Sequence, residues 1–203
     1  MATRSISVAD LHAEQANTLS PPGELLVFPT DTVYGIGVRF DDTAGIERLR
    51  QFKSRPRPQP FSLHLSEVGR ITQFCQPLNS QQEKWMDSLL PGPYTVLLSA
   101  AENAPEDAVL EGKIGIRVPD GTVYPRVEAS FGPLLGTSVN KKGEDPLNEV
   151  NAILKAFQGE IALVIESDEL LSEINSAVID LCVNPPRALR GRLPDHLLSD
   201  YKD

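Results

Sequence analysis

The chain has 203 residues, which is enough for one large α/β domain or two small ones. Its 28 acidic and 19 basic residues give a net charge of −9, which argues against broad electrostatic binding to nucleic acid or to an anionic membrane surface. Any site for an anion must therefore be local.

The expected elements alternate between helices and strands. The helices expected from periodicity and capping are 8–19, a helix capped by Thr43 and running to Phe52, 68–74, a helix opened by a capping box at 80–83, and a helix capped by Asn148 and running to Phe157. The expected strands are 25–28, 61–65, 94–98, 114–118, 133–138, 161–165 and 178–181. With no internal repeat or clear linker, we expect a single domain over 1–203, an open, twisted, mixed α/β sheet flanked by helices.

Cysteine and histidine are too sparse to suggest a metal site. Cys75 and Cys182 lie far apart among apolar neighbours, which predicts neither a disulfide framework nor a thiolate site. The three histidines are dispersed with no i, i+4 pair, so we expect no protein-held metal. No apolar run approaches the roughly eighteen residues of a membrane span, and no signal core follows the first residues. We therefore expect a soluble, cytoplasmic protein with no membrane partner.

Two cations stand out in this acidic chain. Lys53 and Arg55 fall where the 43–52 helix runs into Pro56, and their spacing lets both reach one phosphate chain. Three prolines in 56–60 restrict the loop and lower the entropy lost when it closes on a ligand. An exposed turn rich in proline and arginine is the competing interpretation.

A hydroxyl and an amide follow the strand expected at 133–138. Ser138 and Asn140 are alternate residues of an extended segment, so both side chains can face one ligand.

Segment 29–37 also follows a strand and carries hydroxyls, a carboxylate and two glycines, at a position where open α/β sheets usually hold ligands. Its glycines match neither a Walker loop nor a dinucleotide fingerprint, so a plain glycine-containing turn is the alternative. His64, on the polar face of its strand, is either a structural group or a ligand contact.

Together these segments resemble the threonylcarbamoyl-AMP synthase family, the YrdC-like proteins. The matching stretches run in family order across nearly the whole chain: FPTDTVYGIG (28–37), KSRPRPQPFSLHLS (53–66), PGPYTVLL (91–98), IGIRVPD (114–120), GTSVN (136–140) and SAVIDL (176–181). The combination of K-x-R with S-x-N is the most specific part of the match.

The resemblance implies a cytoplasmic enzyme that joins L-threonine, bicarbonate and ATP into threonylcarbamoyl-AMP and releases pyrophosphate. ATP would be a substrate, with Mg²⁺ held mainly by its triphosphate. Downstream tRNA threonylcarbamoyl transferase proteins would then consume the product. The resemblance also implies a concave, locally positive groove. Two alternatives stay open: a carbamoyl-adenylate-forming paralogue, or a double-stranded RNA-binding module, which would make RNA a weak partner.

The resemblance also implies roles for particular residues. Lys53 and Arg55 would be catalytic, and the nucleotide would contact both of them together with Ser138, Asn140 and Arg190. Threonine would contact Thr32, His64 and Arg117, although a structural ion pair is the competing role for Arg117.

The chain departs from the family pattern near its end and inside the S-x-N motif. The family usually has R-x-G where this chain has Arg190-Gly191-Arg192, so the choice between Arg190 and Arg192 stays open. Val139 stands where alanine is more usual and could narrow the pocket. The acidic stretch 101–112 is expected to be a mobile loop, which could close over the site.

Overall fold

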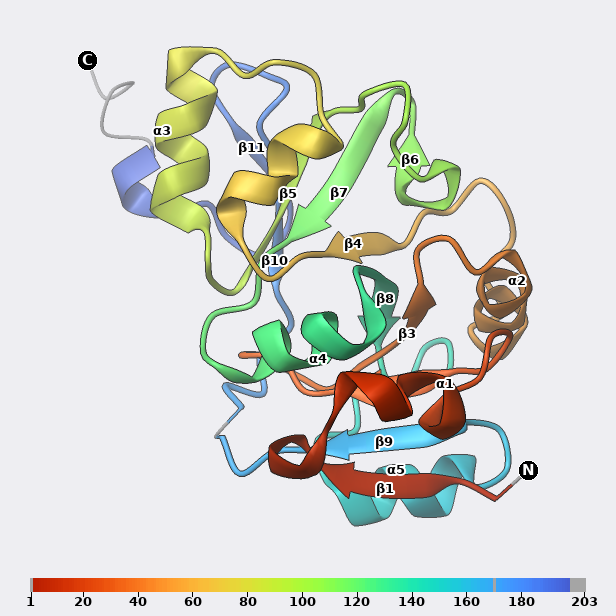
Figure 1. Cartoon of the computed structure of the whole chain (residues 1–203). Helices are drawn as coiled ribbons and strands as arrows, with labels where there is room; N and C mark the ends of the chain where they lie inside the picture. Colours follow the sequence, from red (N-terminus) through yellow and green to blue (C-terminus); the bar gives the residue numbers. More distant parts are fainter. Residues whose placement is uncertain (1, 170, 198–203) are drawn as a thin grey trace.

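The computed structural model describes residues 2–169 and 171–197, in which eleven strands form one mixed sheet (Figure 1). The strand order is β1-β9-β2-β3-β8-β4-β7-β5-β10-β11, with β6 paired to β7 beside this path. The strands are β1 (Arg4–Ser7), β2 (Leu26–Phe28), β3 (Gly35–Arg39), β4 (Ser62–His64), β5 (Tyr94–Ser99), β6 (Val109–Leu110), β7 (Lys113–Arg117), β8 (Leu134–Ser138), β9 (Leu163–Glu166), β10 (Ala177–Asp180) and β11 (Arg187–Arg190). As expected, the sheet is open, mixed and flanked by helices.

The pairing of the central strands places the chemistry-bearing loops together. Strands β2, β3, β8 and β4 are successively antiparallel, while β4 with β7 and β5 with β10 are parallel. In the β3–β8 register, Gly35 lies opposite Ser138 and Gly37 lies opposite Gly136. The start of β3 and the loop before it therefore lie next to the end of β8.

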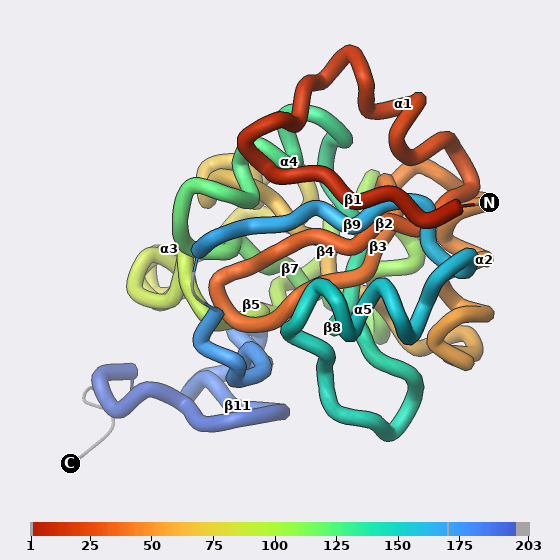
Figure 2. Tube along the Cα trace, turned by 90° about the horizontal axis from the view of Figure 1, so that it is seen from below, coloured from red at the N-terminus to blue at the C-terminus, as the bar shows by residue number. Residues whose placement is uncertain are grey.

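Apolar side chains pack on both faces of the sheet. The α-helices are α1 (Ala16–Leu19), α2 (Thr43–Phe52), α3 (Ser80–Leu89), α4 (Val123–Phe131) and α5 (Val150–Phe157). Seen from below, α1 and α4 lie on one side of the β1–β9–β2 layer and α5 lies on the other (Figure 2). Along β2, Phe28 joins a cluster with Tyr124 and Phe131 of α4, whereas Val27 joins the larger cluster that includes Phe157 of α5. This alternation is the period of two that a strand covered on both faces requires.

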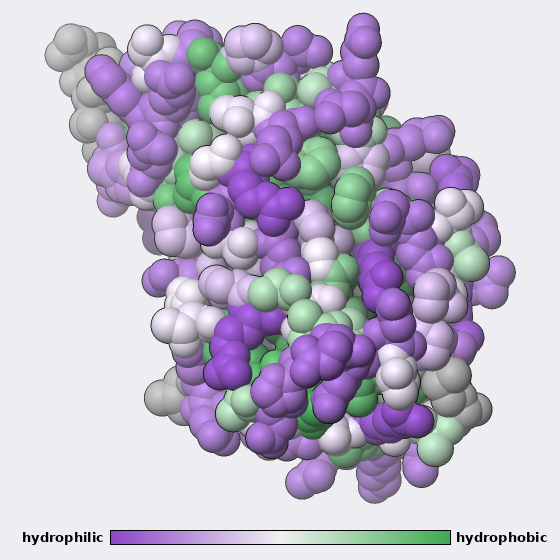
Figure 3. Space-filling model, viewed as in Figure 1, coloured by the Kyte–Doolittle hydropathy of each residue, from purple (hydrophilic) through white to green (hydrophobic). Residues whose placement is uncertain are grey.

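The molecular surface is mainly polar, as expected when most apolar side chains are buried in the core. On the face seen in Figure 1, polar residues cover most of the surface, and apolar residues show in patches between them (Figure 3). None of the helices within the described ranges is both long and apolar enough to cross a membrane.

The expected helix over 8–19 is wrong. The segment forms two 3₁₀ turns and the short α1, because the backbone is extended at Leu11 and His12. The break buries Leu11 against the α4 side of the core. The 68–74 helix forms as a 3₁₀ helix over Val68–Gln73, in a stretch whose glycine and β-branched residues have low helix propensity.

Three helix starts differ from those expected. Asp42 rather than Thr43 caps α2, and Asn79 forms a capping box with Gln82 one residue earlier than expected at α3. No side chain caps α5, which begins after Glu149 rather than after Asn148. Capping side chains near a helix start compete for the same amide groups, and the tertiary fold decides between them.

Strand β3 begins at Gly35, inside segment 29–37, for which the sequence predicts no strand. Its glycines are required by close packing, since a Cβ on Gly37 would lie 2.5 Å from the Leu135 carbonyl oxygen. A Cβ on Gly35 would lie 2.7 Å from the Phe28 ring. These glycines therefore serve the contact between β3, β8 and β2.

Candidate functional site

A cavity of about 400 Å³ lies where β4, β5, β7, β8 and β10 approach β11. Its wall is assembled from segments far apart in the sequence: Thr30 before β3, Arg55 after α2, Leu110 of β6, Ser138 of β8 and Arg190 of β11. The tertiary fold thus brings residues from almost the whole chain to one space.

Positive charge dominates the wall. Among the described residues it carries five basic and two acidic side chains: Arg55, Lys113, Arg117, Arg187 and Arg190, with Glu111 and Asp180. One acid is already paired, because Lys113 Nζ lies 2.7 Å from Asp180 Oδ2. Burial is the main cause that lowers the pKa of Arg55 and Arg117, and the charge of Arg190 adds to both shifts. A bound anion would relieve this crowding of cations.

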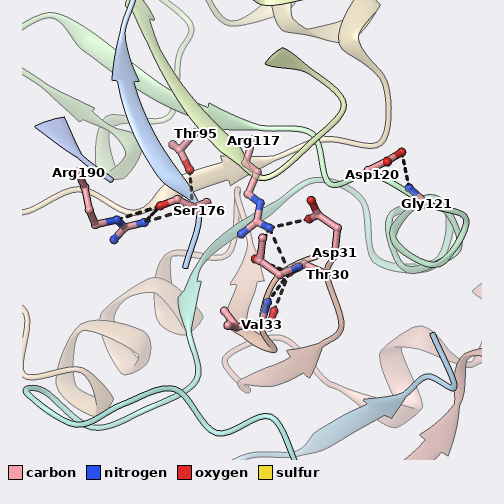
Figure 4. Close-up of polar contacts among 10 residues, drawn as sticks. Thr30, Asp31, Val33, Thr95, Arg117, Asp120, Gly121, Ser176 and Arg190 are labelled. Atoms are coloured by element: carbon pink, nitrogen blue, oxygen red, sulfur yellow. Dashed lines mark hydrogen bonds and ion pairs between the residues drawn. The ribbon is translucent and has the colours of Figure 1, made fainter. Parts of the chain in front are cut away.

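Arg117 is held by the loop before β3 (Figure 4). Its Nη2 donates to Asp31 Oδ1 at 2.6 Å, to Thr30 Oγ1 at 3.2 Å and to Thr32 Oγ1. Arg117 therefore forms a structural ion pair with Asp31, which was the alternative to a role in binding a ligand. Arg117 also lines the cavity, so the two roles are compatible. Within the described residues its buried Nε has no hydrogen-bond partner. The guanidinium is thus positioned by protein on one side and keeps an unmet donor.

Arg190 reaches from β11 to the segment before β10 (Figure 4). Its Nε and Nη2 donate to the Ser176 carbonyl oxygen at 3.0 and 2.9 Å, and the Ser176 hydroxyl lies 3.2 Å from Thr95 Oγ1. Arg190, Ser176 and Thr95 all line the cavity. No role is expected from the sequence for these two hydroxyls, although Thr95 and Ser176 both lie in stretches that carry the resemblance. Arg192 is exposed and lies outside the wall as described, which favours Arg190.

Lys53 is buried behind the wall. Its Nζ donates to the carbonyl oxygens of Ser138 and Asn140 at 3.0 and 2.6 Å, and to Asn140 Oδ1 at 2.9 Å. An ammonium group has three donors, so protein atoms already occupy all of them. Burial, and secondarily the charge of Arg55, lowers the pKa of Lys53 to about 8, which still leaves it protonated at pH 7.

Ser138 lies on the cavity wall as described, whereas Asn140 does not. The Ser138 hydroxyl donates to Asn140 Oδ1 at 2.7 Å, and Asn140 Nδ2 donates to the carbonyl oxygens of Lys141 and Glu144 at 3.0 and 2.6 Å. Of the two, Ser138 lies on the cavity wall, whereas the Asn140 side chain is engaged with protein. Lys53 and Asn140 therefore fix the end of β8 in place.

Arg55 projects from the loop after α2 onto the wall. Its Nη1 donates to the Pro60 carbonyl oxygen at 2.7 Å, and its guanidinium carbon lies 5.1 Å from the centre of the Phe61 ring. This loop contact and the ring leave the remaining guanidinium nitrogens available toward the cavity. Arg55 is the residue of the K-x-R pair that can meet a ligand without first releasing a buried hydrogen-bond network.

His64 is a neutral group in this wall. Burial first, and the charge of Arg117 second, lowers its pKa to about 3. Its Nδ1 lies 3.1 Å from the Ser62 carbonyl oxygen, which favours the hydrogen on that nitrogen. The absence of a side chain on Gly136 makes room for the ring, since a Cβ there would lie 3.2 Å from His64 Cε1.

The structure therefore divides the expected site residues. Arg55, Ser138, His64, Arg117 and Arg190 line the cavity, whereas three others do not: the buried Thr32 and Lys53, and the half-buried Asn140. Thr30 occupies the wall position expected for Thr32, which is fully buried under the Arg117 contact.

Two further expectations concern the shape of the pocket. Val139 is fully buried in the core, so it does not narrow the cavity. The 101–112 stretch is folded as a 3₁₀ turn at Glu106–Ala108 followed by β6, and its Asp107 is paired with Arg50 at 2.6 Å. This acidic stretch thus contributes Leu110 and Glu111 to the wall, and its movement over the site stays a prediction.

A model of one protein family, described as "Telomere recombination" and named Sua5_yciO_yrdC, matches residues 20–191. The chain belongs to the Sua5/YciO/YrdC family. The match includes every candidate site residue, from Thr32 to Arg190.

Proteins similar to this chain include two that are named threonylcarbamoyl-AMP synthase. The chain is 29% identical over 177 residues to that of Pyrococcus abyssi, covering 85% of this chain and 52% of the relative. It is 25% identical over 191 residues to that of Bacillus subtilis, covering 93% and 55%. The chain thus spans about half the length of these two relatives.

Solved structures of the family share the fold. Pyrococcus abyssi Sua5 complexed with L-threonine superposes with a TM-score of 0.80 at 26% identity, covering 93% of this chain and 57% of that one. Escherichia coli YciO superposes with a TM-score of 0.80 at 22% identity, covering 94% and 95%, which shows the fold alone.

Proposed function

We propose that the chain is a threonylcarbamoyl-AMP synthase that joins L-threonine, bicarbonate and ATP and releases pyrophosphate. The observation that carries the proposal is the meeting of Arg55, Arg117 and Arg190 around one cavity in a chain of net charge −9. One arginine suits a carboxylate and the others suit a polyphosphate, because guanidinium groups bind both with paired hydrogen bonds. The synthase names of the relatives support the same reaction.

The proposed roles follow from position. We place the polyphosphate near Arg55, Ser138 and Arg190, with Arg55 stabilising the charge that develops on its oxygens. Lys53 and Asn140 then act as positioning residues, because they fix the end of β8.

The amino acid would lie at the other arginine. Arg117 has an unmet Nε donor for the threonine carboxylate, and Thr30 is the nearest hydroxyl on the wall. The neutral ring of His64 offers a contact for the threonine side chain without adding charge. The threonine complex of a structural relative supports an amino-acid subsite in this fold.

The chemistry needs positioning more than acid–base groups. A carbamate formed from the threonine amine and bicarbonate would attack the α-phosphorus of ATP in line with the departing pyrophosphate. Among the described residues the wall carries two carboxylates, Glu111 and Asp180, and Asp180 is already paired with Lys113, so the wall offers few ligands for a metal. We therefore assign Mg²⁺ mainly to the triphosphate, where it would neutralise charge on the phosphate oxygens.

The place of the reaction and the use of its product are part of the same proposal. We infer a cytoplasmic enzyme in which residues 1–203 form one domain, and whose product downstream tRNA threonylcarbamoyl transferase proteins consume. A mixed anhydride of a carbamate and AMP is readily hydrolysed, so a transferase must accept it soon after release.

Pyrophosphate release tests the proposal. We expect release that requires threonine, bicarbonate and ATP together, and we expect Arg55→Ala to lower kcat on the order of a hundredfold, as for loss of one transition-state donor. Arg192→Ala removes the same charge from an exposed position outside the wall and should stay near wild type. A near wild-type rate for Arg55→Ala would remove Arg55 from this role, and release without threonine would remove the proposed reaction.

A further inference from the structure

A buried arginine on α2 joins two segments of the cavity wall. Arg50 is 6% exposed, and its Nε and Nη2 donate to Asp107 Oδ1 at 3.0 and 2.6 Å. Its Nη1 donates to the carbonyl oxygens of Gln59 and Arg55 at 2.9 and 3.4 Å. One guanidinium therefore ties the loop after α2 to the 3₁₀ turn before β6.

Both of these segments form the wall. The loop supplies Arg55 and Phe61, and the segment from the 3₁₀ turn onward supplies Ala108 and Leu110. A second link runs directly between them, because the Phe61 amide donates to the Asp107 carbonyl oxygen at 2.8 Å. In the described structure, Arg50 and Asp107 themselves lie outside the wall.

The link reaches Arg55 through an aromatic ring. The guanidinium carbons of Arg50 and Arg55 lie 5.0 and 5.1 Å from the centre of the Phe61 ring. The Arg55 amide also donates to the Arg50 carbonyl oxygen at 2.9 Å. The backbone, the carbonyl group and the ring beside Arg55 are therefore all in contact with Arg50.

We propose that Arg50 and Asp107 are positioning residues that hold the Arg55 guanidinium in register with the polyphosphate. The inference rests on the proposed function, because it assigns ATP to the Arg55 part of the cavity. A buried ion pair is weak evidence for a role in stability, since desolvation of the charges offsets their attraction. The planar fork of Arg50, which contacts two wall segments at once, fits a role in geometry.

The variants separate the effect of the positive charge of Arg50 from the effect of its paired hydrogen bonds to the two wall segments. Arg50→Lys keeps the charge but loses the fork, because an ammonium group cannot reach both segments with paired hydrogen bonds. A double variant, Arg50→Met with Asp107→Leu, removes both charges and leaves no buried carboxylate without its main partner. Arg48→Met is the control for loss of an arginine from the same helix, since Arg48 pairs with the largely buried Glu24 at 2.9 Å and lies outside the cavity wall as described.

Two measurements are made on each variant: the thermal midpoint, and steady-state kinetics with ATP and threonine varied separately. We expect Arg50→Lys and the double variant to lower kcat/KM for ATP roughly tenfold or more, because a misplacement of about 1 Å can cost about a hundredfold. The KM for threonine should stay within about twofold, since Arg117 is anchored separately by Asp31. The Arg48→Met control should keep the wild-type kcat/KM for ATP and for threonine, and any fall in its thermal midpoint would report the loss of its pair with Glu24.

Two outcomes overturn the positioning role. Variants with wild-type kcat/KM for ATP would make the pair structural only, and equal losses for ATP and threonine would show general loosening of the cavity. Titration of ATP by calorimetry keeps the test independent of turnover. If wild type binds ATP but releases no pyrophosphate, the proposed reaction fails, while weaker ATP binding by Arg50→Lys still supports positioning. Absence of ATP binding by wild type overturns both.

Discussion

Burial fixes the protonation state of the histidine in the cavity wall. The folded pKa of His64 is about 3, below the ordinary value of about 6.5, so the unfolded chain binds a proton that the folded chain does not. Stability is therefore complete above about pH 6.5 and falls as the pH drops toward 3. The ring stays neutral through the physiological range.

This difference predicts a measurable pH dependence. Between pH 6.5 and 5 the His64 contribution should lower the free energy of unfolding by about 2 kcal/mol, at about 1.4 kcal/mol per pH unit. His64→Gln should lose this part of the slope, while the carboxylates contribute to both proteins alike. Urea unfolding at pH 7, 6 and 5 measures it. Equal slopes for the two proteins would mean that folding does not lower the pKa of His64.

Most elements could be predicted from the sequence, because the hydrophobic periodicity that marks a helix or strand and the capping or turn residues that end it are local features of the chain. The strands around 61–65, 94–98 and 114–118 are confirmed within a residue or so. Strand β3 was missed since its glycines carry no strand propensity and are explained only by their contact with β8 and Phe28. Helix α4 was missed too; its Pro125 lies in the first turn, where proline is tolerated.

The candidate site could be predicted as a set of residues but not as an arrangement. The motifs selected Arg55, Arg117 and Arg190, which the fold brings to one cavity. The spacing of residues in the sequence could not predict that the Lys53 ammonium group donates all three of its hydrogen bonds to protein, two to backbone carbonyl oxygens and one to the Asn140 side-chain oxygen. Nor could it find Arg50, whose role depends on Asp107, a residue 57 positions away.

The contact between β3 and β8 predicts a difference between two glycines. Gly37→Ala should lower the free energy of unfolding by about 1–3 kcal/mol, because the new Cβ would meet the Leu135 carbonyl oxygen at 2.5 Å and backbone cannot yield easily. Gly115→Ala should leave stability within about 0.5 kcal/mol, since its nearest neighbour would be Leu97 Cδ2 at 3.4 Å. Urea denaturation of both variants measures this. Equal costs would contradict the close approach of the two strands.

At the scale of the whole molecule, charge is segregated. The chain carries a net charge of −9, yet among the residues that the structure describes the cavity wall carries five basic and two acidic side chains. Such an arrangement favours a small anion over a long polyanion, because the field outside the cavity is repulsive. This distribution supports a nucleotide substrate more than an extended RNA partner.

The most direct test of the proposed adenylation reaction follows the carbon atom of bicarbonate into the product. Wild-type protein is incubated with L-threonine, ATP, Mg²⁺ and ¹³C-bicarbonate, and the products are identified by mass spectrometry. The account predicts an AMP adduct that contains threonine and one ¹³C atom, formed together with an equal amount of pyrophosphate. Release of ADP and phosphate, or an AMP adduct without the label, would contradict it.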